Sequence, residues 1–151
     1  NSLNFIWALL SSVYGPGRDD NNLISYSIKE LLAGRSPSFT KLEQLWDYIY
    51  IDDLINALYN IGLNGNKNVY AVGSGKPIPL KDVVKLIHSL IDPNIRLDIG
   101  VLEYKGDRID NSVVDISSLT KDTGFQPQFE LKEGIKNTIS YFKEIRKIKN
   151  N

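Results

Sequence analysis

The sequence predicts a mixed α/β fold, a lobe in which strands and helices alternate irregularly, rather than a helical bundle or a β-sandwich. Short segments rich in apolar, aromatic or β-branched residues are interspersed with longer segments whose apolar residues recur at helical spacing. With 151 residues and 42% hydrophobic content, the chain can bury one sizeable core, so a single domain is expected.

Extended segments are predicted, in chain order, at 5–13, 38–40, 46–51, 68–72, 95–101 and 112–114. The first is an apolar run ended by Gly15-Pro16-Gly17, which is typical of a buried strand with neighbours on both sides. Aromatic and β-branched residues favour the next two segments. Apolar and polar residues alternate along 95–101, as in a strand with one exposed face.

Helices are predicted at 22–33, 52–61, 80–91, 115–124 and 131–147. Gly34 and Gly124 stand where the end of a helix favours a left-handed residue, and Asp52 and Asp115 are placed to cap helix starts. The side chains expected to face the core are Leu54, Ile55, Leu58 and Ile61; Val83, Val84, Ile87 and Leu90; and Ile135, Ile139, Phe142 and Ile145.

Charge and composition exclude several classes of function. The 18 Lys and Arg residues balance 18 Asp and Glu residues, and no basic stripe is interleaved with aromatic residues, so no nucleic-acid partner is expected. The chain has no cysteine, which excludes disulfides and thiolate chemistry and is compatible with a cytoplasmic location. No apolar run reaches the length of about 18 residues typical of a membrane span, so no membrane partner is expected. The absence of methionine fits a cleaved or truncated product.

Four separated stretches carry a more specific pattern. They are SVYGPG at 12–17 with NNLI at 21–24, WDYIYIDDL at 46–54, VYAVGSG at 69–75, and a last group made of GD at 106–107, DIS at 115–117 and GFQP at 124–127. In order and spacing they resemble the C-terminal part of the NAD-dependent epimerase/dehydratase family, the extended short-chain dehydrogenases that act on nucleotide sugars. Each stretch is weak alone, but together they cover nearly the whole chain.

The resemblance implies that the chain is the C-terminal substrate-binding part of an NAD(P)-binding Rossmann-fold enzyme whose N-terminal nucleotide domain is missing. Residues 1–17 would be the last-strand remnant of the Rossmann sheet, and 18–151 the substrate-binding lobe. Catalysis in the family needs a glycine-rich turn and a Tyr-x-x-x-Lys pair, and this sequence contains neither. The resemblance therefore implies NAD or NADP in the parent protein, no stable cofactor binding to this chain, no catalytic residue here, and a possible homodimer of the parent.

The family pattern assigns roles to residues near the first turn. Ser11 lies where the backbone approaches the nicotinamide, and Ser12 lies where many members carry an asparagine that touches the sugar-linked phosphate. Asn22 and Leu23 match residues that bind the nucleotide diphosphate. As alternatives, both serines could satisfy strand-end hydrogen bonds, and Asn22 could simply cap a helix.

Other predicted substrate-binding residues include two departures from the family pattern. Phe39 aligns with a segment beside the nucleotide base, and Asp107 belongs to the Gly-Asp pair of the fourth stretch. Trp46 and Tyr104 stand where many members carry an arginine, so planar bidentate contacts to phosphate are lost at both positions. Either these aromatics stack or pack against the ligand, or the ligand differs. Phe39 and Trp46 could also be ordinary core residues.

A metal site is not expected. Three aspartates cluster at 47, 52 and 53, but capping explains Asp52 and the resemblance makes Asp47 structural. The only histidine, His88, falls within a predicted amphipathic helix without a Cys or His partner.

Three functions from different classes remain open. The leading one is the nucleotide-sugar binding half of an NAD(P)-dependent epimerase, dehydratase or reductase, inactive by itself. The second is a non-catalytic nucleotide-sugar binding module. The third is a structural or interaction fragment, which an exposed apolar face would favour.

Overall fold

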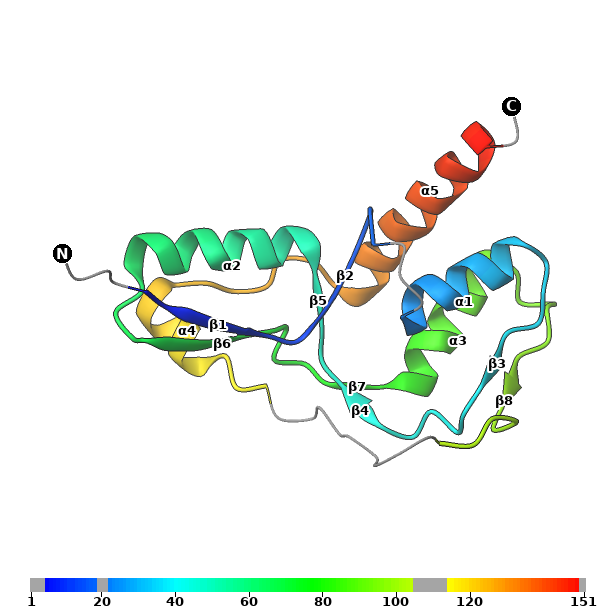
Figure 1. Ribbon diagram of the computed structural model, residues 1–151, viewed down its shortest axis with the longest axis horizontal. Helices are drawn as coiled ribbons and strands as arrows, with labels where there is room; N and C mark the ends of the chain where they lie inside the picture. The colour runs from blue at the N-terminus through cyan, green and yellow to red at the C-terminus, as the bar shows by residue number, and fades with distance from the viewer. Residues whose placement is uncertain (1–4, 19–21, 105–113, 150–151) are drawn as a thin grey trace.

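The computed structural model describes residues 5–18, 22–104 and 114–149, and it has the expected mixed α/β architecture (Figure 1). The strands are β1 Trp7–Leu10, β2 Ser12–Tyr14, β3 Ser38–Phe39, β4 Leu45–Trp46, β5 Tyr48–Tyr50, β6 Val69–Val72, β7 Ile78–Pro79 and β8 Asp98–Ile99. The helices are α1 Leu23–Leu32, α2 Ile51–Asn64, α3 Leu80–Ile91, α4 Ser117–Thr123 and α5 Leu131–Lys149.

The strands pair two by two. β1 runs parallel to β6, β2 to β5 and β3 to β8, whereas β4 and β7 are antiparallel. The pair β1–β6 lies with α2 and α4 at one end of the molecule, and the pair β3–β8 lies with α1 and α3 at the other (Figure 1). The pair β2–β5 connects the two ends, and this is where the chain brings distant segments together.

The first predicted strand is two strands, and its predicted burial is wrong. The chain changes partner at Ser11, whose backbone N–H donates to Val72 O at 2.8 Å, while the N–H of Ser12 donates to Asp47 O at 3.2 Å. Trp7 and Leu9 are 62% and 58% exposed. Their exposure has a simple cause, because among the described residues β1 pairs only with β6 and its outer face is left uncovered.

Helix α2 differs from its predicted start and its predicted buried face. It begins at Ile51 with Tyr50 as its N-cap, so Asp52 lies in the first turn and does not cap the helix. Ile55 and Leu58 are 58% and 42% exposed, contrary to prediction. The buried residues are Asp53, Leu54, Ala57 and Ile61, because this stripe packs against β6 and α4.

The other helices follow the sequence closely. α3 has its predicted bounds, with Val83, Val84 and Ile87 buried and Leu90 partly buried. Gly34 and Gly124 have φ values of +72° and +74° where α1 and α4 end, as a left-handed helix end requires. α5 runs two residues further than predicted.

The extended segments are shorter than predicted near the middle of the chain. Within 95–101 only Asp98–Ile99 form a strand. Most of the predicted segment 112–114 lies outside the described residues. Asp115 stands just before α4, where its Oδ1 accepts a hydrogen bond from the N–H of Ser117 at 2.9 Å.

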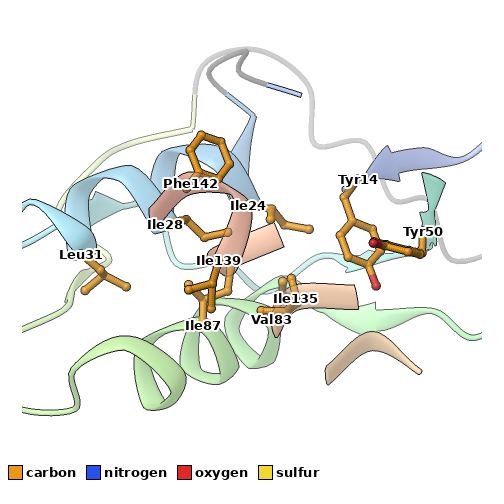
Figure 2. Packing of buried hydrophobic residues seen from close by; sticks show 10 residues of the cluster. All are labelled: Tyr14, Ile24, Ile28, Leu31, Tyr50, Val83, Ile87, Ile135, Ile139 and Phe142. Atoms are coloured by element: carbon orange, nitrogen blue, oxygen red, sulfur yellow. The ribbon is translucent and has the colours of Figure 1, made fainter. Parts of the chain in front are cut away.

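The largest part of the core lies between α1, α3 and α5. Figure 2 shows Ile28, Ile87 and Ile139, one from each helix, pointing toward one another, and all three are buried. Tyr14 and Tyr50 extend this cluster to the β2–β5 pair. The helices therefore fix the position of the strand ends that carry the candidate site. No helix among the described residues has the length and apolar character needed to cross a membrane.

Candidate functional site

A cleft of about 390 Å³ lies where the start of β2, the start of α1, β4 and the start of α3 come together. Residues far apart in the sequence form its walls. The lining residues are Ser12, Val13, Arg18, Asn22, Leu23, Gln44, Trp46, Tyr48, Leu80 and Tyr104.

Five residues predicted from the sequence to contact substrate line this cleft: Ser12, Asn22, Leu23, Trp46 and Tyr104. They come from four separate segments of the chain, so their convergence is a property of the fold and not of sequence proximity. The roles assigned to them remain predictions.

The other three predicted site residues lie elsewhere or are not described. Phe39 is 3% exposed and packs in the core with Leu42 and Val84, which is the alternative the sequence left open. Ser11 does not line the cleft. Asp107 lies outside the described residues.

Trp46 and Ser12 form one wall of the cleft together. The indole N–H of Trp46 donates a hydrogen bond to Ser12 Oγ. β2 places Ser12 opposite Tyr48 of β5, while β4 places Trp46 opposite Ile78 of β7. Because Ser12 Oγ accepts from the indole, its own hydroxyl hydrogen can be donated to a ligand.

Asn22 is the N-cap of α1. Its Oδ1 accepts from the N–H groups of Ile24 and Ser25, both at 3.0 Å, and its Nδ2 donates to Ser25 Oγ at 3.0 Å. The capping alternative is therefore what the geometry shows for the side chain. The start of α1 still borders the cleft, where the positive end of the helix dipole favours an anion.

Sequence reasoning missed Arg18, Gln44 and Tyr48 as lining residues. The Arg18 guanidinium donates to Val13 O and brings a cation into a cleft that lacks the two arginines common in similar sequences. The feature of the sequence that could have indicated this role is the position of Arg18 directly after the Gly15-Pro16-Gly17 turn. Gln44 carries no comparable signal, and only the structure reveals that its Oε1 accepts from the Tyr104 hydroxyl at 3.0 Å.

The electrostatic character of the cleft is that of an anion site with aromatic walls. Among the described residues, its lining includes one cationic side chain, Arg18, and no aspartate or glutamate. Burial raises the pKa of the Tyr48 phenol well above its usual range, an effect that the positive charge of Arg18 partly opposes. Tyr48 is therefore neutral at physiological pH. Such a cleft suits a ligand that combines a phosphate with a ring.

Two buried aspartates hold the backbone around this region. Asp47 is fully buried and accepts from the N–H and Oγ of Ser74 at 2.8 and 3.0 Å. Asp53 accepts from the N–H groups of Gln128 and Phe129 at 2.8 and 3.1 Å. These bonds give both carboxylates a structural role, and the described residues contain no group of three potential metal ligands.

The Ser11 hydroxyl is closely surrounded by its neighbours. The Ser11 Oγ is buried without a hydrogen-bond partner, but it is enclosed beside Gly73 and Asp47. A Cβ on Gly73 would lie 3.0 Å from Ser11 Oγ and 2.7 Å from Asp47 Oδ1, which shows how little space is left there. The sequence has no glycine-rich phosphate-binding turn, and the assignment of Ser11 to the cofactor site remains a prediction.

Comparison with known proteins agrees with the resemblance seen in the sequence. The NAD dependent epimerase/dehydratase family matches residues 1–73. CDP-abequose synthase of Salmonella typhimurium is 32% identical over 92% of this chain. UDP-glucose 4-epimerase of Thermotoga maritima, solved with UDP-glucose, superposes with a TM-score of 0.83 at 25% identity over 92% of this chain. The chain is similar to members of this family over nearly its whole length.

The same similarity accounts for the fold. The structural relatives are Rossmann-fold nucleotide-sugar enzymes, which confirms the predicted fold class. The Bordetella bronchiseptica enzyme WbmF, solved with NAD+ and UDP, shares the fold with a TM-score of 0.80 at 23% identity. The chain spans 48% of the Salmonella typhimurium CDP-abequose synthase and 46% of the epimerase, about half the length of the relatives it matches.

Proposed function

We propose that this chain is the nucleotide-sugar binding part of an NAD(P)-dependent epimerase, dehydratase or reductase, and that its cleft holds the nucleotide diphosphate. The observation that carries this proposal is the convergence of Ser12, Asn22, Leu23, Trp46 and Tyr104 on one cleft that also contains Arg18. Residues 1–17 would belong to the Rossmann sheet of the whole protein, and 18–151 to the substrate-binding lobe.

The cleft offers complementary groups to each part of such a ligand. Arg18 and the start of α1 favour the diphosphate, because both present positive charge to the same space. Trp46 and Tyr104 supply flat apolar surface for the base in place of the arginines found elsewhere in the family. The Ser12 hydroxyl can donate to the sugar-linked phosphate.

The leading candidate for the base is cytosine. Two of the relatives are CDP-abequose synthases, at 32% and 31% identity, whereas several dTDP-glucose 4,6-dehydratases reach 27% or 28%. A CDP-linked sugar is therefore the first ligand to test, and dTDP- and UDP-linked sugars are the alternatives.

The proposal also holds that this chain alone does not catalyse the reaction. Catalysis in the family needs the glycine-rich turn and the Tyr-x-x-x-Lys pair, which this sequence lacks. The uncovered apolar residues of β1 support a missing neighbour, since Phe5, Trp7 and Leu9 lie at alternate positions and are 66%, 62% and 58% exposed. A cytoplasmic location remains a prediction of the sequence.

Calorimetric titration with CDP, dTDP and UDP tests the proposal. We expect CDP to bind, and Arg18→Ala to weaken binding by about tenfold, because a charge-assisted contact to phosphate is lost. Arg35→Ala is the matched control, since Arg35 pairs with Glu30 at the far end of α1. A folded chain that binds none of the three nucleotides would favour the structural or interaction function instead.

A further inference from the structure

A second pocket, of about 280 Å³, lies beside the cleft. It sits between the 74–78 segment and the 127–131 segment, with β2 and β5 behind it. Its lining residues are Tyr14, Tyr48, Ser74, Lys76, Pro77, Ile78, Pro127, Phe129, Glu130 and Leu131. Among the described residues, only Tyr48 lines both this pocket and the cleft, so the two spaces share one wall.

The walls of this pocket are held in place from behind. Asp47 binds the backbone and hydroxyl of Ser74 on one side, and Asp53 binds the backbone of Gln128 and Phe129 on the other. Both carboxylates are buried, at 0% and 2% exposure. The pocket is therefore pre-formed, which lowers the ordering cost of binding.

Three aromatic residues, Tyr14, Tyr48 and Phe129, contribute to the lining, beside the aliphatic side chains of Ile78 and Leu131 and two prolines. The rings of Tyr14 and Tyr48 pack edge to face, with their centroids 6.1 Å apart. The ring of Phe129 packs against Tyr50, which does not line the pocket, with a centroid distance of 4.6 Å. A further ring placed against these edges and faces would extend a packing geometry that aromatic groups favour. Burial raises the pKa of both Tyr14 and Tyr48, so their hydroxyls stay neutral. The Tyr14 hydroxyl donates to Leu131 O at 3.5 Å and can still accept a hydrogen bond.

The rim carries one charge of each sign. Lys76 Nζ and Glu130 Oε1 lie 3.1 Å apart across the two walls, and both side chains are largely exposed. Glu130 would repel an anionic ligand, and Lys76 would repel a cationic ligand. The pocket is also near the lower end of the volumes that hold drug-sized ligands, which run from about 300 to 1,000 Å³.

We propose that this pocket is a second ligand site, specific for a small neutral aromatic compound with one hydrogen-bonding group, of the phenol class. The ring would pack against Tyr14, Tyr48 and Phe129, and the polar group would reach the neutral hydroxyls or the rim. The proposal does not depend on what the cleft binds.

Amide chemical-shift mapping with phenol as the probe tests it. We expect phenol to shift the amides of Ser74, Lys76 and Glu130 at millimolar concentration, and Phe129→Ala to abolish these shifts. Shifts that are absent at these amides, that persist unchanged in folded Phe129→Ala, or that appear only around the cleft would overturn the proposal.

A charge series keeps the test independent of whether Phe129→Ala folds. We expect phenol to bind more tightly than benzoate or benzylammonium. Lys76→Glu should raise benzylammonium affinity relative to phenol by about threefold, the size of an exposed ion-pair effect. Lys85→Glu, an exposed change on α3 that lines neither space, should leave the ratio unchanged. The same ratio of benzylammonium to phenol affinity in Lys76→Glu and Lys85→Glu would contradict the proposed site.

Discussion

Gly134, in the first turn of α5, shows how closely single residues fit around the β2–β5 strands. A Cβ at this position would overlap the hydroxyl oxygen of Tyr14 and would lie 2.9 Å from Tyr50 Cδ2. Both tyrosines belong to the buried cluster in Figure 2, so neither ring can move without disturbing the core. The glycine is therefore required by contact and not by its backbone conformation.

We expect Gly134→Ala to lower the free energy of unfolding by about 1–3 kcal/mol, the usual cost of overpacking a core. Gly62→Ala in α2 is the matched control, because a Cβ there meets nothing within 4 Å. That change should be neutral or should stabilise the helix by up to about 1 kcal/mol. Urea denaturation measures both. Equal stabilities of the two variants would argue against the contact, and combining Gly134→Ala with Tyr14→Phe should recover part of the loss.

The candidate site illustrates what residue-level reasoning can and cannot reach. Ser12 and Trp46 were predicted from their places in the family pattern, and the structure joins them by a hydrogen bond. Gln44 had no such signal, and Tyr48 lies within the 46–54 stretch of the pattern without being assigned a role there. Their places in the lining depend on the path of the chain between β3 and β5. The sequence pattern around Phe39 fits a core residue as well as a substrate-binding residue. Only the packing in the structure distinguishes these two roles.

At the scale of elements, the helices were predictable and the strand environments were not. Apolar spacing placed α1 and α3 nearly to the residue, and Gly34 marked the end of α1, because both signals are local properties. β1 and the outer face of α2 depend on neighbours. Their apolar residues read as buried in the sequence but are exposed among the described residues, since no described element covers them.

The exposed face of β1 predicts self-association of this chain. Apolar side chains at Phe5, Trp7 and Leu9 beside an open strand edge favour pairing with another copy. We expect sedimentation velocity to show concentration-dependent association, and Trp7→Lys with Leu9→Lys to reduce it. Val101→Lys with Leu102→Lys is the control pair, because these residues are also exposed but follow β8. A chain that stays monomeric at all concentrations would refute the prediction.

At the scale of the whole molecule, the aromatic cluster makes stability depend on alkaline pH. Burial raises the pKa of both Tyr14 and Tyr48 in the folded chain, whereas tyrosines of the unfolded chain titrate near pH 10. Above that pH the unfolded chain loses protons that the folded chain retains, so the free energy of unfolding falls as pH rises. Below it both states are protonated and the full stability is present.

Urea denaturation between pH 7 and pH 11 measures this effect. We expect a decline that begins near pH 10. It should be shallower in the Tyr14→Phe and Tyr48→Phe variants, and replacement of the exposed Tyr59 should leave it unchanged. The same decline in all three variants would show that other groups cause it.

The overall architecture was predictable because the family pattern extends over nearly the whole chain. The cleft was not predictable in the same way, because it forms only where four separate segments meet. We propose that these four segments together bind a nucleotide diphosphate.

The fluorescence of the two tryptophans during a titration with CDP tests that claim most directly. Trp46 lines the cleft, whereas Trp7 is on the exposed face of β1. We expect CDP to change the emission of the unmodified chain and of Trp7→Phe to a similar extent, and to leave Trp46→Phe nearly unchanged. A response that survives in Trp46→Phe and disappears in Trp7→Phe, or no response in any folded form, would contradict the account.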